Sequence, residues 1–500
     1  MSKDLRGLGV SPGSASGPAL RLGSPPKLPG AEPAVTDTEA EAGRAVAALE
    51  KVGEFLRGRS AAASGQAADI LEAEAMMAGD PALASQVRSL AGAGRPAAWA
   101  VSEALAAYRA MLTSAGGYLA ERAADLDDIA DRAVALLLGE PMPGIPAPGH
   151  PYVLLAADLA PADTATLDPA AVLAIVTERG GPTSHTAILA KTLGIPAVVA
   201  CPRALSVADG TVVAVDGATG TVVVEPTAEQ VEQAARRGAE RAARLAAARG
   251  PGLTKDGHPV KLLANVGGPA DVTAAIAADA EGVGLLRTEF LFLDRHDEPS
   301  GEEQRDTYAE ILGGMHGRKV VVRTLDAGAD VWVMAPMVST PAEAAAFADR
   351  AHGHGLPVAG VMIEVPAAAL CAAQIVDQVD FVSIGTNDLS QYTFAADRQA
   401  SALAPLLDPW QPALLQLIAM TATAGRAAGK PVSVCGEAAS DPLLAVVLVG
   451  LGVTSLSMAP ASLAEVRAIL AERTLAQCQA AAAAALTAAD PAAARACAAG

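Results

Sequence analysis

The segment at residues 180–186, GGPTSHT, holds the side chain best suited to carrying a reactive group. Two glycines and a proline form a tight turn, and His185 then opens an apolar helical stretch, AILAKTLG. Backbone amides and the dipole at a helix start favour a bound anion, and imidazole is nucleophilic near neutral pH. The segment therefore predicts that His185 carries a phosphoryl group. The plainer alternative is a capping turn in which the histidine is incidental.

A second set of polar residues follows β-rich runs in the carboxyl-terminal half. Singly, each has a structural explanation: an arginine in a salt bridge, a cysteine acting as a small hydrophobe, or a glutamate that ends a strand. Their joint occurrence at successive strand ends predicts a catalytic site instead. The residues are Arg287, Arg323, Glu364, Asn387, Asp388 and Cys435.

These residues can form one site only if the fold brings the carboxyl ends of the strands close together. From residue 259 onward, eight β-rich runs alternate mostly with alanine-rich helical patterns, which is typical of a (β/α)8 barrel. In such a barrel the carboxyl ends of the strands form the catalytic face. The runs are KLLANVG, GVGLLRTEF, KVVVRTLD, VWVMAPM, VAGVMIEV, VDFVSIGTND, PVSVCGE and TSLSMAP.

The preceding half is organised differently. Residues 1–20 read as turn-rich strands, residues 36–138 as long helices, and residues 141–151 as a proline-rich linker. Residues 152–226 alternate short strands with the helix after His185, which predicts a compact α/β domain whose sheet the first strands could complete. The arginines of residues 229–249 fit a solvated connector helix better than a phosphate grip. We expect the alanine-rich tail from residue 476 to be a frayed helix.

Composition narrows the function classes. Among 500 residues, Lys and Arg number 36 and Asp and Glu 55, so the net charge is −19, which argues against non-specific nucleic-acid binding. The longest apolar run, residues 443–453, is too short to span a membrane, and the first residues lack the apolar core of a signal peptide. Five scattered cysteines indicate a reducing compartment. We expect a cytoplasmic, multidomain α/β protein.

Several long motifs occur in a distinctive order: GGPTSHTAILAKTLGIPAVV, GVGLLRTEFLFLDR, VVVRTLD, VMIEVPAA, SIGTNDLSQYTFAADR and VCGEAASDP. This order resembles Enzyme I of the sugar phosphotransferase system, from the opening GVSPGSASGPA to about residue 470. Dikinases and phosphoenolpyruvate synthases share some modules but need a large ATP-binding domain, for which this chain has no room. The resemblance implies a phosphohistidine α/β domain (1–20 plus 146–226), an inserted helical domain that binds HPr (21–145), a linker helix (227–250), a phosphoenolpyruvate-binding barrel (251–475) and a tail (476–500).

The resemblance also implies roles for individual residues. His185 would be phosphorylated by phosphoenolpyruvate and would pass the group to HPr, with Thr164 orienting it. Arg287 and Arg323 would hold the substrate phosphate, and Asn387, Asp388 and Arg398 would complete the substrate grip. Glu364 and Asp388 would bind Mg²⁺, and Cys435 would protonate the enolate to give pyruvate. A homodimer through the barrel is implied as well.

For the helical insertion, we expect an acidic rim of Glu72, Glu74 and Asp80 around an apolar patch of Met76, Met77 and Leu83, to which the resemblance adds Arg122. Such a rim would steer a basic partner. An ordinary helix face with a core stripe is the alternative interpretation.

The sequence departs from the family between KVVVRTLD and VWVMAPM, where only residues 327–330 intervene. Family members carry several dozen residues here, including a lysine and an arginine of an NPxLGxR segment. Because parallel neighbours normally need a crossover of about a dozen residues, we expect a barrel that lacks its third crossover helix and is open or distorted, with low turnover. Pro182, where many relatives have arginine, is a smaller departure.

Two functions follow. One is phosphoryl transfer from phosphoenolpyruvate to HPr. The other is a binding or regulatory role, in which the chain exchanges phosphate with phospho-HPr and uses phosphoenolpyruvate poorly.

Overall fold

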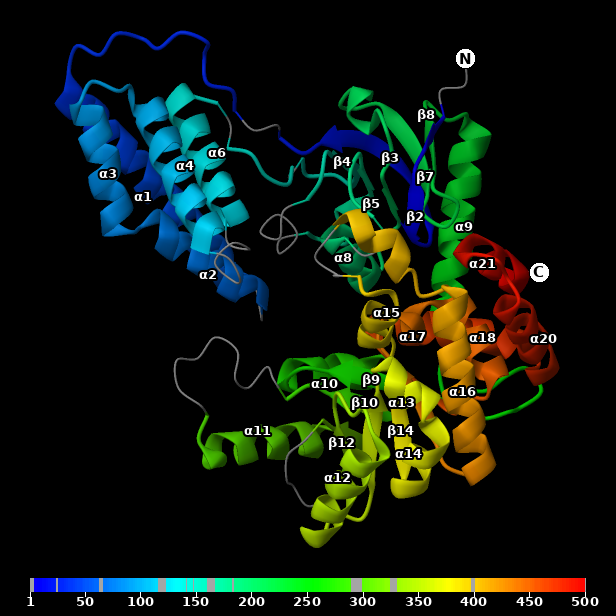
Figure 1. Cartoon of the computed structure of the whole chain (residues 1–500). Coiled ribbons are helices and arrows are strands. Elements are labelled where there is room, and N and C mark those ends of the chain that lie inside the picture. Colours follow the sequence, from blue (N-terminus) through cyan, green and yellow to red (C-terminus); the bar gives the residue numbers. More distant parts are fainter. Residues whose placement is uncertain are drawn as a thin grey trace. The chain divides into compact units, whose positions relative to one another are not determined.

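The computed structural model describes residues 4–499 except 24–25, 63–65, 116–122, 141, 147, 160–166, 182–183, 289–298, 324–330 and 397–400. The chain divides into two compact units, Met1–Gly238 and Ala239–Gly500 (Figure 1). Within the described part, no helix combines the length and apolar character needed to cross a membrane.

A helical bundle follows the first three strands, as the sequence predicts for residues 36–138 (Figure 1). Its core is aliphatic, with Leu49, Val52 and Leu56 packing against Ile129. Asp80 caps the third helix, because its carboxylate accepts a hydrogen bond from the amide of Ala82. The helices are α1 (Thr38–Ala62), α2 (Gln66–Ala78), α3 (Pro81–Gly92), α4 (Ala97–Ala115) and α6 (Ala123–Leu138).

The rest of the first unit is built on an eight-stranded mixed sheet, in the order β1-β8-β7-β3-β4-β5-β6-β2. The amino-terminal strands do complete this sheet, since β3 pairs in parallel with β4 and antiparallel with β7. The strands are β1 (Leu5–Arg6), β2 (Leu8–Ser11), β3 (Ser14–Arg21), β4 (Tyr152–Ala156), β5 (Val172–Thr177), β6 (Ala197–Val199), β7 (Val212–Asp216) and β8 (Thr221–Val224). The helices are α8 (His185–Leu193), η1 (Ala204–Ser206) and α9 (Ala228–Ala247), the last of which runs across the boundary between the two units.

The second unit is a closed barrel of eight parallel strands, which confirms the predicted barrel architecture. The strands are β9 (Lys261–Val266), β10 (Gly282–Leu286), β11 (Lys319–Val322), β12 (Val331–Ala335), β13 (Ala359–Ile363), β14 (Phe381–Gly385), β15 (Val432–Cys435) and β16 (Ser455–Met458). The helices are α10 (Pro269–Ala277), α11 (Gly301–Gly314), α12 (Pro341–Gly353), α13 (Pro366–Leu370), α14 (Ala372–Gln378), α15 (Thr386–Phe394), η3 (Ser401–Leu407), α16 (Pro412–Ala428), α17 (Glu437–Ser440), α18 (Pro442–Leu451), η4 (Pro460–Ser462), α19 (Leu463–Glu472), α20 (Leu475–Leu486) and α21 (Pro491–Ala499).

Alternation along each strand separates two layers of side chains. Val320 and Val322 of β11 join the core shared with helices such as α11, whereas Val321 lies inside the barrel with Leu285 and Met334. Successive side chains of a strand point to opposite faces. The same alternation therefore directs Arg323, two residues after Val321, toward the interior side of the strand end.

The expectation of an open or distorted barrel is wrong. Strands β11 and β12 pair in parallel, with Val320 opposite Val331 and Val322 opposite Val333. The physical reason is the short return: from Val322 the chain must travel back by only two residue rises, about 7 Å, to the level of Val320. Residues 323–330 can span more than 20 Å when extended, roughly, so no helix is needed. The segment 324–330 itself lies outside the described residues.

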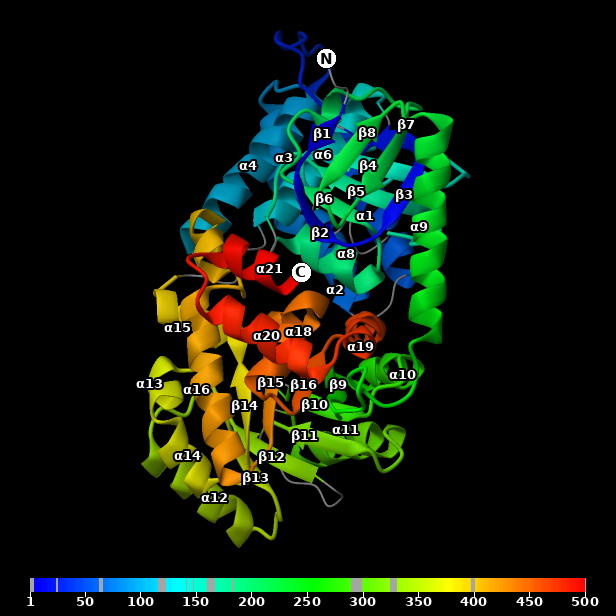
Figure 2. The same cartoon turned by 90° about the vertical axis from the view of Figure 1, so that its right-hand side faces the viewer.

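The expectation of a frayed tail is also wrong. Helix α20 packs beside α18 (Figure 2), and Cys478, Ala482 and Ala494 are fully buried in the core of the second unit. Small side chains permit this close approach: a Cβ on Gly450 would lie only 2.0 Å from the carbonyl oxygen of Cys478. The alanine residues that suggest a low-complexity tail in the sequence form the surface through which these helices pack.

Candidate active site

His185 is the first residue of α8. The side chain of Ser184 caps this helix by accepting a hydrogen bond from the amide of Ala187 at 3.3 Å, and Gly180, at φ +99°, makes the preceding turn. Thr186 is buried, and its hydroxyl donates to Asp158 at 3.4 Å. The backbone of His185 thus lies in the first helical turn, where amides and dipole favour an anion. Its side chain lies outside the described residues.

A cavity of about 460 Å³ occupies the carboxyl-terminal end of the barrel. Six of the residues that the sequence predicts as a site line it, and they come from four different strand ends of the barrel and the start of α15. These are Arg287, Arg323, Glu364, Asn387, Asp388 and Cys435. The spacing along the chain is large, so the barrel alone brings them together.

The two arginines leave neighbouring strands and are fixed at the backbone. The amide of Arg287 donates to the carbonyl of Val266 at 2.9 Å, and that of Arg323 donates to Leu286 at 3.2 Å. The carbonyl of Arg323 also accepts from the hydroxyl of Thr288 at 2.8 Å. Two guanidinium groups at one rim supply paired donors that match a phosphate or a carboxylate.

Glu364 is buried, with only 2% of its surface exposed. Its Oε1 accepts a hydrogen bond from the amide of Met337 at 2.7 Å, and Met337 adopts a left-handed backbone conformation with φ +55°. Beside the carboxylate lies Gly385, where a Cβ would come within 2.6 Å of Oε2 of Glu364. A side chain at this position would collide with the carboxylate, so the close approach of β14 to Glu364 requires a glycine.

Asn387 is hydrogen-bonded to the residues that directly follow the strand of Cys435. Its Oδ1 accepts from the amide of Glu437 at 3.1 Å, and the hydroxyl of Thr386 donates to the carbonyl of Cys435 at 3.1 Å. Both contacts pass close to Gly436, which has φ +101°. The start of α15 and the end of β15 therefore form one hydrogen-bonded corner of the cavity.

Cys435 is 1% exposed and faces this corner. The Ser383 hydroxyl donates to its Sγ at 3.5 Å, and the thiol donates to the carbonyl of Ile384 at 3.5 Å. Burial, together with the Glu364 carboxylate, raises the pKa of the Cys435 thiol to about 11, against the opposing effect of the hydrogen bond from Ser383. The thiol is consequently protonated at neutral pH and can donate a proton to a carbanion-like carbon.

Other predicted residues are not placed. Thr164, Arg398 and Arg122 lie outside the described residues, as does Pro182. In the helical bundle, Glu74 and Leu83 are fully buried, so they do not belong to the predicted surface patch. The mistake is one of helix phase: both lie on the inward faces of α2 and α3, while Glu72 and Met76 are exposed.

Sequence reasoning missed four residues that shape the site: Met337, Ser383, Thr386 and Gly436. Position alone could have indicated three of them. Met337 follows the fourth strand, while Thr386 and Gly436 adjoin the predicted Asn387 and Cys435. Ser383 could not be recognised, because an inward-pointing serine in a strand resembles any other interior position.

Three models of phosphoenolpyruvate-utilising enzymes match the chain in order. The amino-terminal model covers residues 6–122, the mobile-domain model 148–220, and the phosphoenolpyruvate-binding-domain model 241–347 and 329–475. Relatives named phosphoenolpyruvate-protein phosphotransferase cover nearly the whole chain. The Streptomyces coelicolor protein is 52% identical over an alignment of 537 positions, which covers 97% of this chain and 96% of that protein.

Relatives with lower sequence identity carry the same name and also match nearly the whole chain. The Haloferax volcanii protein is 36% identical, with 94% of each chain covered, and the Priestia megaterium protein is 34% identical, with 93% of each covered. Taken with the barrel and its cavity, these matches show that the chain belongs to the phosphoenolpyruvate-protein phosphotransferase family, the Enzyme I of the phosphotransferase system, and is a phosphoenolpyruvate-dependent phosphotransferase.

Proposed function

We propose that His185 takes the phosphoryl group from phosphoenolpyruvate held in the barrel cavity and passes it to HPr, as the first step of sugar uptake. The observation that carries this proposal is the convergence of two arginines, two carboxylates, an amide and a neutral thiol on one cavity. A substrate that carries a carboxylate and a phosphorylated enol, and whose leaving group is the enolate, needs these groups: cations for its charged oxygens and an acid for its methylene carbon.

In this scheme the imidazole of His185 attacks phosphorus, so that a nitrogen–phosphorus bond forms as the bond to the enolic oxygen breaks. Arg287 and Arg323 bind the charged oxygens and hold the substrate for in-line transfer. The electron pair left on the enolate moves to its methylene carbon. Cys435 donates its proton there, which yields pyruvate, and the thiolate is then reprotonated from solvent.

Glu364 and Asp388 would hold Mg²⁺, since carboxylate oxygens are the ligands this ion prefers and it usually takes one or two of them beside substrate oxygens. Among the described residues no group of three or more His, Cys, Asp or Glu could hold a metal ion, so an ion held by these two carboxylates would need substrate oxygens to complete its coordination. When bound, the ion would neutralise developing charge on the phosphoryl group.

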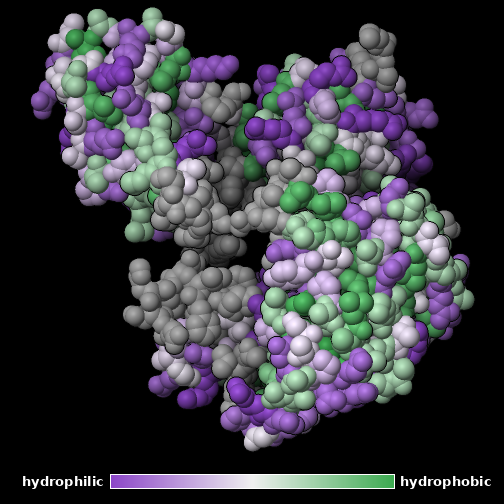
Figure 3. Space-filling view, in the orientation of Figure 1, coloured by the Kyte–Doolittle hydropathy of each residue, from purple (hydrophilic) through white to green (hydrophobic). Residues whose placement is uncertain are grey.

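The helical bundle would receive HPr on the face of α2 that exposes Glu72 and Met76, the latter with 70% of its surface exposed. Because His185 belongs to the first unit and the cavity to the second, transfer implies that the two units meet during the cycle. A homodimer would form through the barrel unit, where apolar side chains lie among polar ones near α15 and α16 (Figure 3). Tyr392 and Leu406 are exposed there.

The test is phosphorylation of the purified protein by labelled phosphoenolpyruvate with Mg²⁺. We expect acid-labile label in the wild type and in His354→Ala, a matched control at an exposed histidine, and none in His185→Ala. Label that persists in His185→Ala would overturn the proposal.

A second candidate, a chain that exchanges phosphate with phospho-HPr but uses phosphoenolpyruvate poorly, is favoured by the lengths of the alignment. The 537 positions aligned with the Streptomyces coelicolor protein exceed the 500 residues of this chain, so at least 37 positions of the relative have no counterpart. The match to the phosphoenolpyruvate-binding domain also breaks into two segments that overlap at 329–347. We infer an internal deletion next to β12. Label transfer from phospho-HPr without label from phosphoenolpyruvate would establish this candidate.

A further inference from the structure

The interior of the barrel is apolar on one side and polar on another. Val321 and Met334 fill the side formed by β11 and β12. Three later strands carry hydroxyls at interior positions instead: Ser383 on β14, Ser433 on β15 and Ser455 on β16. Each serine adjoins apolar residues of the outer core, so its own side chain points inward. All three are buried. Because a buried hydroxyl costs free energy that an alanine would not, packing alone does not explain them.

The three serines form a row across neighbouring strands. Ser383 lies opposite Ser433, and Ser433 lies opposite Ser455 in the parallel ladders. Neighbouring strands lie about 4.8 Å apart, a span that one water molecule can bridge between two hydroxyls. The Oγ atom of Ser433, in the middle of the row, is buried and has no hydrogen-bond partner among the described residues. Buried polar atoms of this kind are usually satisfied by an internal water.

One end of the row reaches the thiol of Cys435. The hydroxyl of Ser383 donates a hydrogen bond to its Sγ at 3.5 Å. Cys435 also follows Ser433 by two residues on β15, so both side chains lie on the interior face of that strand. The cysteine has only 1% of its surface exposed. A thiolate formed at this position would therefore meet a serine hydroxyl more readily than bulk water.

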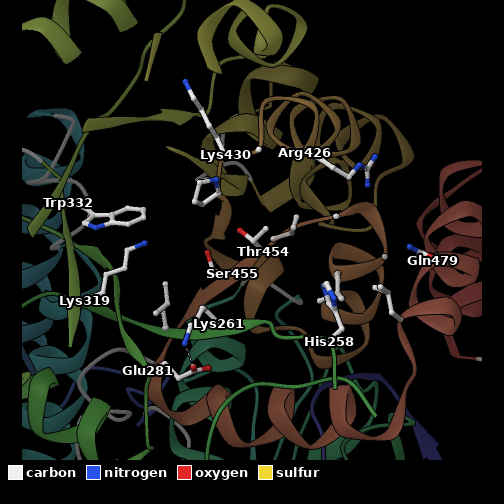
Figure 4. A pocket seen from close by; sticks show the side chains of 18 residues that line it. His258, Lys261, Glu281, Lys319, Trp332, Arg426, Lys430, Thr454, Ser455 and Gln479 are labelled. Atoms are coloured by element: carbon white, nitrogen blue, oxygen red, sulfur yellow. Dashed lines mark hydrogen bonds and ion pairs between the residues drawn. The ribbon is translucent and has the colours of Figure 1, made fainter. Parts of the chain in front are cut away.

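The other end of the row opens into a second cavity, of about 750 Å³, at the amino-terminal ends of the strands. Ser455 is the first residue of β16 and lines this cavity beside Thr454 (Figure 4). Solvent reaches the cavity, since the side chain of Lys261 on its wall is 65% exposed. Cys435, in contrast, ends β15 and lines the candidate active site. The row of serines therefore links the thiol to solvent at the opposite mouth of the barrel.

We propose that Ser383, Ser433 and Ser455 return a proton from this cavity to the thiolate of Cys435 after each turnover. The inference rests on the proposed function, because protonation of the enolate is the step that leaves a thiolate. Ser383 gives its hydroxyl proton to Sγ and takes one from the water that bridges to Ser433, and the same exchange continues through Ser455. Each oxygen gives one proton and accepts one. The proton comes from water in the cavity, and the hydroxide left there is neutralised by buffer.

The test follows pyruvate formation by quench-flow, with saturating phosphoenolpyruvate, Mg²⁺ and HPr. The first turnover uses the proton already on Cys435, whereas every later turnover needs its return. Ser383→Ala and Ser433→Ala should therefore form about one pyruvate per chain at the wild-type rate and then slow by about tenfold or more. Ser433→Thr, which keeps a hydroxyl, should restore the wild-type time course. These serines act through Cys435, so a purely structural defect would slow the first turnover as well.

Ser390→Ala is the matched control. Ser390 is buried in the same unit and its hydroxyl likewise has no partner among the described residues, but it lies on helix α15 and not on a barrel strand. This variant should behave as the wild type does. Later turnovers at the wild-type rate in both alanine variants, or a first turnover that is slowed equally, would overturn the relay alone. If one variant does not fold, the other gives the decision. A wild type that forms no pyruvate would overturn the proposed function together with the relay.

Discussion

At the scale of single residues, the corner around Cys435 depends on a glycine. Gly436 has φ +101° and ψ −170°, a combination that residues with a Cβ scarcely adopt. A Cβ there would also lie 2.7 Å from the Thr386 hydroxyl and 2.9 Å from Oδ1 of Asn387. The position therefore fixes where the thiol and the amide can sit.

We predict that Gly436→Ala lowers the turnover of phosphoenolpyruvate by at least a hundredfold, since a displacement of about 1 Å can cost that much. The measurement is the initial rate of label incorporation from phosphoenolpyruvate. Gly429→Ala is the matched control, because Gly429 has a left-handed backbone but no neighbour within 4 Å of a Cβ. Equal losses in both variants would mean that backbone strain, and not the corner, is responsible.

The thiol gives a second prediction. Because the pKa of Cys435 is raised to about 11, its proton is present throughout neutral pH and is lost only as pH rises through that value. The pH–rate profile for pyruvate formation should show no descending limb from this thiol between pH 6 and 9. Cys435→Ala should lower the rate by about 10²–10⁴, the usual contribution of a general acid. A rate within threefold of the wild type would remove Cys435 from the mechanism.

At the scale of elements, helix α6 carries a destabilising charge. Burial, reinforced by the like charges of Asp128 and Asp127, raises the pKa of Asp131 to about 6. A carboxyl whose pKa is raised on folding contributes stability below its ordinary pKa of 3.8 and loses that contribution as pH rises through 6. The bundle should therefore be less stable at pH 7.5 than its other groups alone would make it.

Asp131→Asn should raise the melting temperature of the bundle at pH 7.5 and raise it clearly less near pH 4.5, as followed by circular dichroism. Glu54→Gln is the matched control, because Glu54 is an exposed carboxyl of α1 in the same bundle and is not one of the charges that act on Asp131. It should not stabilise at either pH. A benefit from Asp131→Asn that is the same at both pH values would contradict this origin.

Sequence patterns predicted the elements well wherever one periodicity dominated. The eight β-rich runs became β9–β16, and the polar residues after them line one cavity. The sequence patterns failed where the outcome depends on a distance in space or on which face of a helix points inward. Few residues separate Arg323 from β12, but the distance that the chain must return along the barrel is small enough for these residues to span it. Glu74 and Met76 are two positions apart on one helix, and only the packing of α2 shows which is buried.

At the scale of the whole molecule, the two reactions of the proposed cycle draw on different units. Charging by phosphoenolpyruvate needs the cavity of the second unit, whereas exchange with phospho-HPr needs His185 and the helical bundle of the first. A defect beside β12 should therefore affect the first reaction and spare the second. This separation gives the inferred deletion a consequence that can be measured.

Inserting the corresponding segment of the Streptomyces coelicolor protein between Asp326 and Val331 should raise the rate of charging by phosphoenolpyruvate about a hundredfold. The resemblance implies that the arginine of the NPxLGxR segment contacts the substrate, and restoring one charged donor at a phosphoryl-transfer site is worth an effect of that order. The rate of exchange with phospho-HPr should stay within twofold, and a glycine–serine insert of equal length should improve neither reaction. If the native segment leaves charging unchanged, the closed eight-stranded barrel is already a complete catalyst, and the shortened connection is a neutral variation of this family.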